Sequence, residues 1–220
     1  MIIGEQKPID EIRKSIAPYK KVLVAGCGTC VAVCLSGGEK EVGILSSVLR
    51  IADKIDGIER EIREQTITRQ CEYEFLEQLR ENVQSVDAVL SLACGVGVQD
   101  VAAMYPDVPV LPGLNTTFMG RPLEQGLWVE ECAGCGNCIL AETGGICPIA
   151  RCAKNLLNGP CGGSHDGKCE ISDDTQCAWA LIYDKLSSMG KAKNMEEIKA
   201  AKDWSTASGP RKMVREDLRK

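Results

Sequence analysis

Lys21-Val-Leu-Val-Ala-Gly-Cys-Gly-Thr-Cys30 is the stretch that decides the fold of this 220-residue chain. Its beginning is a short, valine-rich apolar run, which predicts a buried strand over residues 21–26. Two glycines, Gly37 and Gly38, interrupt the chain soon afterwards. From Glu39 to Asp53 apolar residues recur at helical spacing, which predicts a helix. These residues are Val42, Ile44, Leu45, Val48, Leu49 and Ile51.

The alternation of strand and helix continues to about residue 120. Further strands are predicted over residues 62–68, 86–92 and 108–111, and further helices over 72–83 and 99–104. Strands that alternate with helices are typical of a parallel sheet with right-handed crossovers. The sequence therefore predicts an α/β fold, with a small doubly wound parallel sheet in a domain formed by residues 1–120.

The character of the chain changes after residue 120. In residues 121–185 glycine, cysteine, proline and asparagine replace the periodic apolar pattern. Such a segment buries little apolar surface and is normally organised by metal, so we expect an irregular and helical cluster domain. Residues 186–220 form a polar C-terminal arm with one predicted helix, 195–202. We expect the arm to dock on a partner; folding back on its own domain is the alternative.

Composition narrows the classes of function. The formal net charge is −5, and lysine and arginine are scattered, which disfavours nucleic acid as the main partner. The N-terminus lacks the basic flank and apolar core of a signal peptide, and no apolar run approaches the roughly 20 residues of a membrane-spanning helix. We expect a cytoplasmic protein without a membrane span. In a reducing cytosol, thirteen cysteines indicate metal or redox chemistry rather than disulfides.

The first group of cysteines follows the ends of the predicted strands. Cys27 and Cys30 follow the first strand, Cys71 the second and Cys94 the third. In an open parallel sheet, ligands bind beyond the carboxyl ends of the strands. Four thiolates at one sheet edge would form a [4Fe–4S] or zinc site. Cys34 is either an alternative ligand or a buried packing residue.

Two other interpretations of this group stay open. Cys27-Gly-Thr-Cys30 after a strand resembles a thioredoxin-type redox dithiol, which would make the chain a thiol–disulfide oxidoreductase. The same stretch contains two glycines of a dinucleotide-binding loop. Valine at position 31 replaces the third glycine, so this second match is partial.

The second group contains the other eight cysteines. Cys132-Ala-Gly-Cys135-Gly-Asn-Cys138, followed by Cys147-Pro148, is the pattern with which bacterial ferredoxins hold [4Fe–4S] clusters. The rest of the group is Cys152, Cys161, Cys169 and Cys177. One grouping joins Cys177 to the first three cysteines and leaves Cys147, Cys152, Cys161 and Cys169 as a second site. Two or three [4Fe–4S] clusters are expected in the chain, with zinc as the alternative at one site. The single histidine, His165, lies in a turn and is expected not to be a ligand.

Three segments resemble a known family. They are Gly26-Cys-Gly-Thr-Cys-Val-Ala-Val-Cys-Leu-Ser-Gly-Gly-Glu-Lys-Glu-Val42, Ser91-Leu-Ala-Cys-Gly-Val-Gly-Val-Gln99 and Leu156-Leu-Asn-Gly-Pro-Cys-Gly-Gly163. They look like the small cysteine-rich iron–sulfur subunit of methylenetetrahydrofolate reductase in acetogenic bacteria, a unit that also resembles the methylenetetrahydrofolate reductase C-terminal-like domain. The likeness extends from about Lys21 into the tail, and the asparagine–glycine–proline–cysteine stretch is its most specific part.

The resemblance implies a partner and a role. The partner would be an FMN-containing TIM-barrel flavoprotein that reduces methylenetetrahydrofolate to methyltetrahydrofolate. The small subunit would relay electrons to the flavin through iron–sulfur clusters, without substrate chemistry of its own, and further electron-donor subunits fit the same scheme. Within this family zinc is the alternative metal, which would make the chain a scaffold subunit of the same complex.

Overall fold

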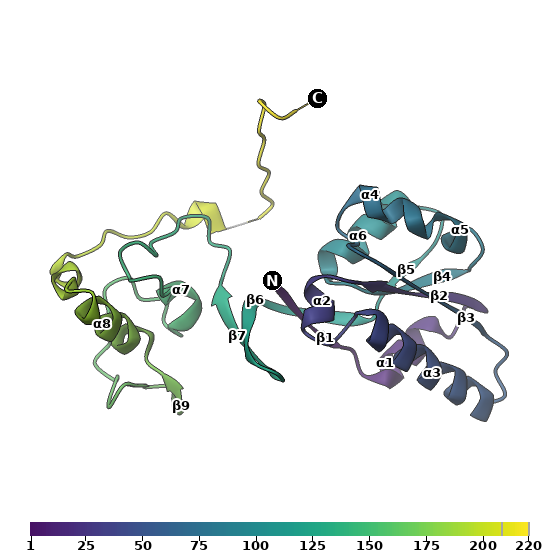
Figure 1. Cartoon of the computed structure of the whole chain (residues 1–220), viewed down its shortest axis with the longest axis horizontal. Coiled ribbons are helices and arrows are strands. Elements are labelled where there is room, and N and C mark those ends of the chain that lie inside the picture. Colours follow the sequence, from purple (N-terminus) through teal and green to yellow (C-terminus); the bar gives the residue numbers. More distant parts are fainter. Residues whose placement is uncertain (208, 220) are drawn as a thin grey trace. The chain divides into compact units, whose positions relative to one another are not determined.

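The computed structural model describes residues 1–207 and 209–219. The chain divides into two compact units, Met1–Val129 and Glu130–Lys220 (Figure 1). The first unit contains the larger sheet and most of the long helices. The second contains short elements and the second group of cysteines.

A four-stranded sheet forms the centre of the first unit. Its strands are β2 (Lys21–Cys27), β3 (Glu61–Ile67), β4 (Ala88–Leu92) and β5 (Val110–Pro112), in the order β3-β2-β4-β5. All three neighbouring pairs are parallel. This confirms the predicted parallel sheet and places the boundaries of each predicted strand within two residues. The strand order reverses at β2, so the carboxyl ends of β2 and β4 flank the point where ligands bind in such sheets.

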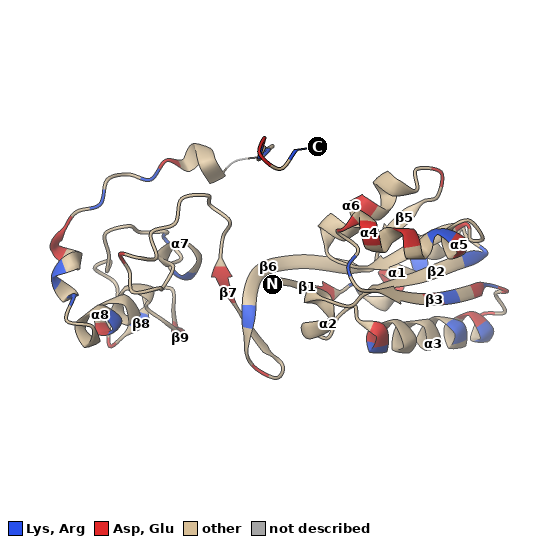
Figure 2. Cartoon of the chain, turned by 45° about the horizontal axis from the view of Figure 1, so that its top comes forward, with Lys and Arg blue, Asp and Glu red and all other residues tan. Residues whose placement is uncertain are grey.

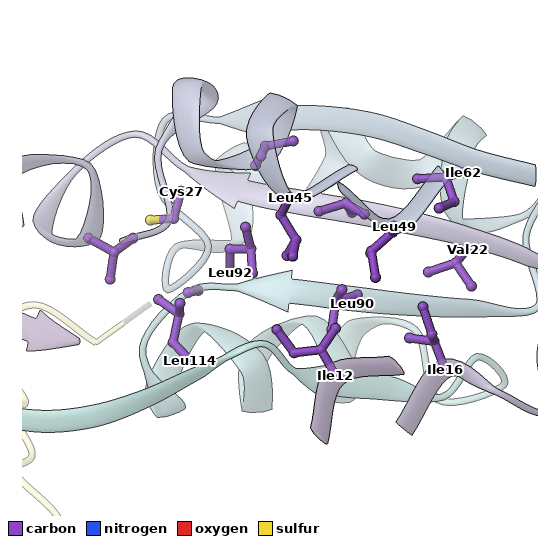
Figure 3. Close-up of a cluster of buried hydrophobic side chains, with 14 of the residues drawn as sticks. Ile12, Ile16, Val22, Cys27, Leu45, Leu49, Ile62, Leu90, Leu92 and Leu114 are labelled. Atoms are coloured by element: carbon purple, nitrogen blue, oxygen red, sulfur yellow. The ribbon is translucent and has the colours of Figure 1, made fainter. Parts of the chain in front are cut away.

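Helices cover both faces of this sheet. On one face α1 (Ile9–Ile16) and α3 (Glu39–Ile55) pack against Val22 and Val24 of β2, in the cluster drawn in Figure 3. On the other face lie α4 (Tyr73–Leu76), η1 (Glu77–Leu79), α5 (Arg80–Val83) and α6 (Gly95–Met104). There, Leu23 and Ala25 of β2 join a second apolar cluster. Successive residues of a strand point to opposite faces, so one apolar strand supplies both cores.

The long helix α3 is apolar on two sides. Val42, Leu45 and Leu49 are buried against the sheet. The other three apolar residues of the predicted helix, Ile44, Val48 and Ile51, are exposed in the described structure. The periodicity therefore predicted the helix correctly but did not distinguish its core face from its outer face.

Several elements differ from the prediction. The helix expected over residues 72–83 is broken into α4, η1 and α5, although Leu76, Leu79 and Val83 all stay buried. The helix expected from residue 99 begins at Gly95. Neither α1 nor the sheet of β1 (Ile2–Gln6), β6 (Leu114–Glu124) and β7 (Leu127–Cys132) was predicted from the sequence. Residues 121–132 therefore belong to β6, β7 and the turn between them, and not to an irregular segment.

The second unit is built from short pieces. They are α7 (Pro148–Arg151), β8 (Lys168–Cys169), β9 (Ser172–Gln176), α8 (Ala178–Ser188), η2 (Ala192–Glu196) and η3 (Trp204–Ala207). Its small core consists of Cys177, Trp179, Ile182 and Leu186 with partly buried neighbours. The helix predicted over residues 195–202 is wrong, because beyond Glu196 this stretch is held in an irregular conformation by side-chain contacts.

Two further features bear on the classes of partner. Figure 2 shows lysine and arginine interspersed with aspartate and glutamate along α3 and along the arm. None of the helices in residues 1–207 and 209–219 combines the length and apolar character that crossing a membrane requires.

Candidate metal centres

Four cysteines of the first group lie at the carboxyl edge of the parallel sheet. Cys27 is the last residue of β2, and Cys30 begins the short helix α2 (Cys30–Val33). Cys71 lies four residues beyond the end of β3, and Cys94 is the residue that precedes α6. The topology therefore places all four at the ends of three neighbouring strands.

Gln70 fixes the loop that carries Cys71. The Gln70 side chain is fully buried; its Nε2 donates to the carbonyl oxygen of Ala25 (2.9 Å), and its Oε1 accepts from Ser91 Oγ (2.6 Å). Ala25 belongs to β2 and Ser91 to β4, so this amide holds the loop beside both strands. Cys71 is consequently held near the ends of the strands that carry Cys27 and lead to Cys94.

The ionisation of Cys71 is coupled to that of two other thiols of the group. Burial raises the pKa of Cys71, and the nearby Cys27 and Cys94 raise it further, while Arg69 opposes them. Like charges that interact in this way disfavour ionisation unless a cation compensates them. The group therefore has the chemistry of a site that would gain from a bound metal. Cys30 is partly buried at the start of α2. Among the described contacts, none joins its sulfur to the other three.

Cys34 has a different environment. Its side chain is buried, and the Gly4 backbone N–H donates to its Sγ (3.5 Å). The same sulfur lies 3.1 Å from Ser36 Oγ and contacts the carbonyl oxygens of Gly4 and Val31. These contacts favour the packing role over the ligand role for Cys34, because its sulfur is already enclosed by the polypeptide.

Four cysteines of the second unit line one cavity. They are Cys152, Cys161, Cys169 and Cys177, together with Lys154, Ser164, Glu170 and Trp179. Cys152 follows α7, Cys169 ends β8 and Cys177 immediately precedes α8. The structure thus places Cys177 with Cys152, Cys161 and Cys169, which differs from the grouping that joined Cys177 to the first three cysteines.

Hydrogen bonds favour the thiolate form of Cys177. Burial opposes its ionisation, but hydrogen bonds from Ser164 and from the backbone N–H groups of Ala180 and Trp179 outweigh burial, so the pKa of Cys177 is lowered. The N–H donors come from the first turn of α8, where backbone N–H groups lack partners within the helix. A thiolate is the form of cysteine that binds metal.

An ion pair lies beside the same thiols. Lys154 pairs with Glu170, and Glu170 Oε2 lies 3.4 Å from Cys161 Sγ. The hydrogen bond to Glu170 is the largest cause that raises the pKa of Lys154, with smaller contributions from Cys161 and Cys152. The cavity therefore combines four thiols with one cation whose charge is already shared with a carboxylate.

Glycines around this cavity permit close approach. A Cβ atom at Gly159 would lie 2.2 Å from the Trp179 ring, and one at Gly163 would lie 1.9 Å from the Glu170 carboxylate. Side chains at either position would displace groups that line the cavity. Gly159 and Gly163 of the Asn158-Gly-Pro-Cys-Gly-Gly163 stretch are thus explained by close packing against Trp179 of α8 and against Glu170.

The first three cysteines of the second unit share one loop. The Gly134 backbone N–H donates to Cys132 Sγ (3.4 Å), and Cys135 Sγ lies 4.0 Å from the carbonyl oxygen of Asn137. Gly134 and Gly136 both adopt positive φ, which lets this loop turn tightly. Cys147 caps α7, with Pro148 at the first helical position, and it is partly buried.

The cysteine sulfurs are suitable ligands for a metal, although the thiols do not converge on one point in the described structure. Within residues 1–207 and 209–219, no three histidine, cysteine, aspartate or glutamate side chains converge closely enough to hold an ion. Four thiols around one cavity nevertheless form the donor set of [4Fe–4S] and zinc sites. His165 lies outside this set: its ring nitrogens contact the Gly163 carbonyl oxygen (3.3 Å) and Asp173 (3.0 Å).

Part of the chain matches the model of a known protein family. Residues 111–205 match the family model described as "Methylene-tetrahydrofolate reductase C terminal". The matched stretch contains all eight cysteines of the second group. No curated protein and no solved structure matches the chain.

Proposed function

We propose that this chain is an electron-transfer subunit that binds [4Fe–4S] clusters and passes electrons to an FMN-containing flavoprotein. The flavoprotein would be the TIM-barrel subunit that reduces methylenetetrahydrofolate to methyltetrahydrofolate. One observation supports this most directly: Cys152, Cys161, Cys169 and Cys177 line one cavity within the segment that matches the methylenetetrahydrofolate reductase C-terminal family.

The positions of the cysteines support the following ligand sets. Cys152, Cys161, Cys169 and Cys177 would hold one cluster. Cys132, Cys135 and Cys138 would hold a second, with Cys147 as the fourth ligand, because Cys177 lies in the other cavity. A third metal would bind at the edge of the parallel sheet, through Cys27, Cys30, Cys71 and Cys94.

A relay role suits the polar groups near these sites. Electron transfer needs ligands and a protein environment that tunes the metal, whereas acid–base catalysis needs a positioned proton carrier. Around the four-cysteine cavity, Lys154 is paired with Glu170, and the exposed His165 is paired with Asp173. Their arrangement supports metal binding and electrostatic tuning rather than proton transfer to a substrate.

A zinc scaffold is the second candidate, because four thiols around one cavity are also the donor set of structural zinc. The thiol–disulfide alternative fits less well. A reactive thiol is partly exposed in an electropositive environment, whereas Cys27 is buried and its Sγ lies 3.6 Å from Thr29 Oγ1.

Electron transfer to flavin tests the proposal. The chain, purified without oxygen and reduced with dithionite, is freed of excess reductant and mixed with the oxidised flavoprotein. Loss of the flavin absorbance, together with return of the cluster absorbance, is the expected result. A chain that contains only zinc, or a reduced cluster that leaves the flavin oxidised, would contradict the relay.

A further inference from the structure

We infer that three side chains of the C-terminal arm, Lys202, Thr206 and Arg211, position the Cys132–Cys138 loop for metal binding and set the charge around its thiolates. This inference rests on the proposed function, and it extends that function by assigning positioning residues to one centre. The arm was expected to dock on a partner. In the described residues up to Arg211 it instead contacts its own unit, which is the folded-back alternative.

The three side chains bind consecutive parts of the loop. Lys202 Nζ donates to the carbonyl oxygen of Asn137 (2.5 Å) and Thr206 Oγ1 to that of Cys135 (2.8 Å). Arg211 Nη1 donates to the carbonyl oxygen of Gly134 (2.9 Å). Three of the loop's carbonyl groups are therefore directed toward the arm.

This arrangement determines where the loop N–H groups point. In a trans peptide the carbonyl and the following N–H point in opposite directions. With three carbonyls turned toward the arm, the N–H groups of Cys135, Gly136 and Cys138 point away from it. Backbone N–H groups that face thiolates stabilise the negative charge of a cluster and raise its reduction potential. The arm would thus orient these peptides as donors.

Glycine at position 136 allows the close approach of the arm. Gly136 has a φ of +80°, and a Cβ atom there would lie 2.8 Å from the carbonyl oxygen of Thr206. Any other residue would be strained by this φ and would also push Thr206 away. Glycine at position 136 therefore allows the loop to turn and Thr206 to pack against it.

The arm is anchored before it reaches the loop. Asn158 makes two hydrogen bonds to the Lys199 backbone, to its carbonyl oxygen (2.9 Å) and from its N–H (2.7 Å). The Lys199 side chain pairs with Glu142 (3.2 Å) and Glu197 (2.8 Å). These contacts fix the chain three residues before Lys202, so Lys202 reaches Asn137 from a held position.

Lys202 is a largely buried cation whose charge interacts with the exposed carboxylate of the adjacent Asp203. Its side chain is largely buried, with the residue 8% exposed, and the Trp204 ring lies 5.9 Å from Nζ. Within the described part of the chain it forms no ion pair, and the adjacent Asp203 is exposed and bonded to Ser205. A buried ammonium group is costly without a counter-charge. A cluster bound by Cys132, Cys135 and Cys138 would add further negative charge beside it.

Four variants of the full chain test the inference. Lys202→Met and Arg211→Met remove a cation, Thr206→Val removes only a hydroxyl, and Lys212→Met is the matched control because Lys212 is exposed and makes no contact of this kind. The first readout is amide hydrogen exchange in residues 133–138. We expect about tenfold faster exchange in the first three variants, the factor that corresponds to losing one hydrogen bond of this strength, and no change in the control.

The second readout is the reduction potential of the cluster. If the side chains only held the loop in place, removing a charge would not lower the potential more than removing a hydroxyl. Lys202→Met and Arg211→Met should both lower the potential, and Thr206→Val should lower it less. Lys202→Arg keeps the positive charge and should keep the wild-type potential. Unchanged exchange and potential in Lys202→Met and Arg211→Met would overturn the inference. If Cys135→Ala leaves the iron content unchanged, the proposed function fails at this centre, while hydrogen exchange still decides whether the arm positions the loop.

Discussion

Gln70 shows how one buried residue can organise a site. Its amide bridges β2 and β4 through Ala25 and Ser91, and α6 packs directly on it, since a Cβ atom at Gly97 would lie 2.9 Å from Gln70 Cβ. The neighbouring Cys71 is held at the sheet edge by these contacts. A polar residue in the core is thus explained by the position of the cysteine that follows it.

Replacing this amide should destabilise the first unit. Gln70→Leu would remove the side-chain donor to the Ala25 carbonyl and the acceptor of the Ser91 hydroxyl from the core, at a cost of about 2–4 kcal/mol. Denaturant unfolding measures the free-energy difference, and Gln84→Leu is the control because Gln84 is exposed. Equal effects of the two substitutions would show that the buried amide contributes no more than a surface one.

His165 provides a titration that can be assigned without ambiguity, because it is the only histidine. Its hydrogen bond with the Gly163 carbonyl, followed by that with Asp173, raises its pKa above the ordinary 6.5. The protonated form is favoured in the fold, so its stabilising effect is complete below pH 6.5 and is lost as the pH rises through the folded-state pKa. Proton NMR of the zinc-substituted, diamagnetic protein should give a midpoint above 6.5, and Asp173→Asn should lower it. A midpoint at or below 6.5 would contradict these contacts.

At the scale of elements, α3 carries apolar residues both on its buried face and on its exposed face. Leu49 is completely buried, whereas Ile51, two residues later, is 61% exposed. Both residues belong to the same apolar pattern in the sequence. Their difference comes from which side of the helix packs on β2 and β3, and that is a tertiary property.

A matched pair of truncations tests this orientation. Leu49→Ala should lower the free energy of unfolding of the first unit by about 2–5 kcal/mol, because it leaves a cavity under α3. Ile51→Ala should change it by less than about 0.5 kcal/mol. Denaturant unfolding of the two variants provides the comparison. A large loss in Ile51→Ala would mean that this face of α3 is covered.

The parallel sheet could be predicted because its signals are local. Residues 21–26 form an apolar run between polar segments, and Ala88–Leu92 repeats that pattern. The strand β1 could not be found in this way, since Ile2 pairs with Met119 and Gln6 with Leu114, far along the chain. Nothing within Ile2–Gln6 itself specifies that partner.

In the C-terminal arm, by contrast, a helix was predicted that the structure does not contain. Residues 195–202 have a helical spacing of apolar and charged residues, but Asn158 binds the Lys199 backbone and Glu142 binds its side chain. Long-range contacts therefore replaced the local helix. The candidate ligands were identifiable by residue type alone, whereas the association of Cys177 with Cys152, Cys161 and Cys169 required the fold.

At the scale of the whole molecule, the two units differ in what stabilises them. The first has two large apolar clusters on the two faces of one sheet. The second has one small cluster centred on α8, together with eight cysteines. A unit with so small a core needs another source of folding energy, and metal binding is the source that its cysteines suggest.

Limited proteolysis should separate the two units. Removing the metal with a chelator should make residues after Glu130 sensitive to protease, while a fragment close to Met1–Val129 survives. The same digestion of metal-loaded chain is the control. Equal resistance of the second unit with and without metal would show that its short elements are stable on their own.

Iron and sulfide content of the cavity variant tests the central claim most directly. The wild-type chain, Cys177→Ala and the packing control Cys34→Ala are purified without oxygen and analysed for iron, sulfide and zinc. Cys177→Ala should lose about four iron atoms per chain, one cluster's worth, and Cys34→Ala should lose none. Wild-type iron content in Cys177→Ala, or zinc in place of iron in the wild-type chain, would contradict an iron–sulfur cluster at Cys152, Cys161, Cys169 and Cys177.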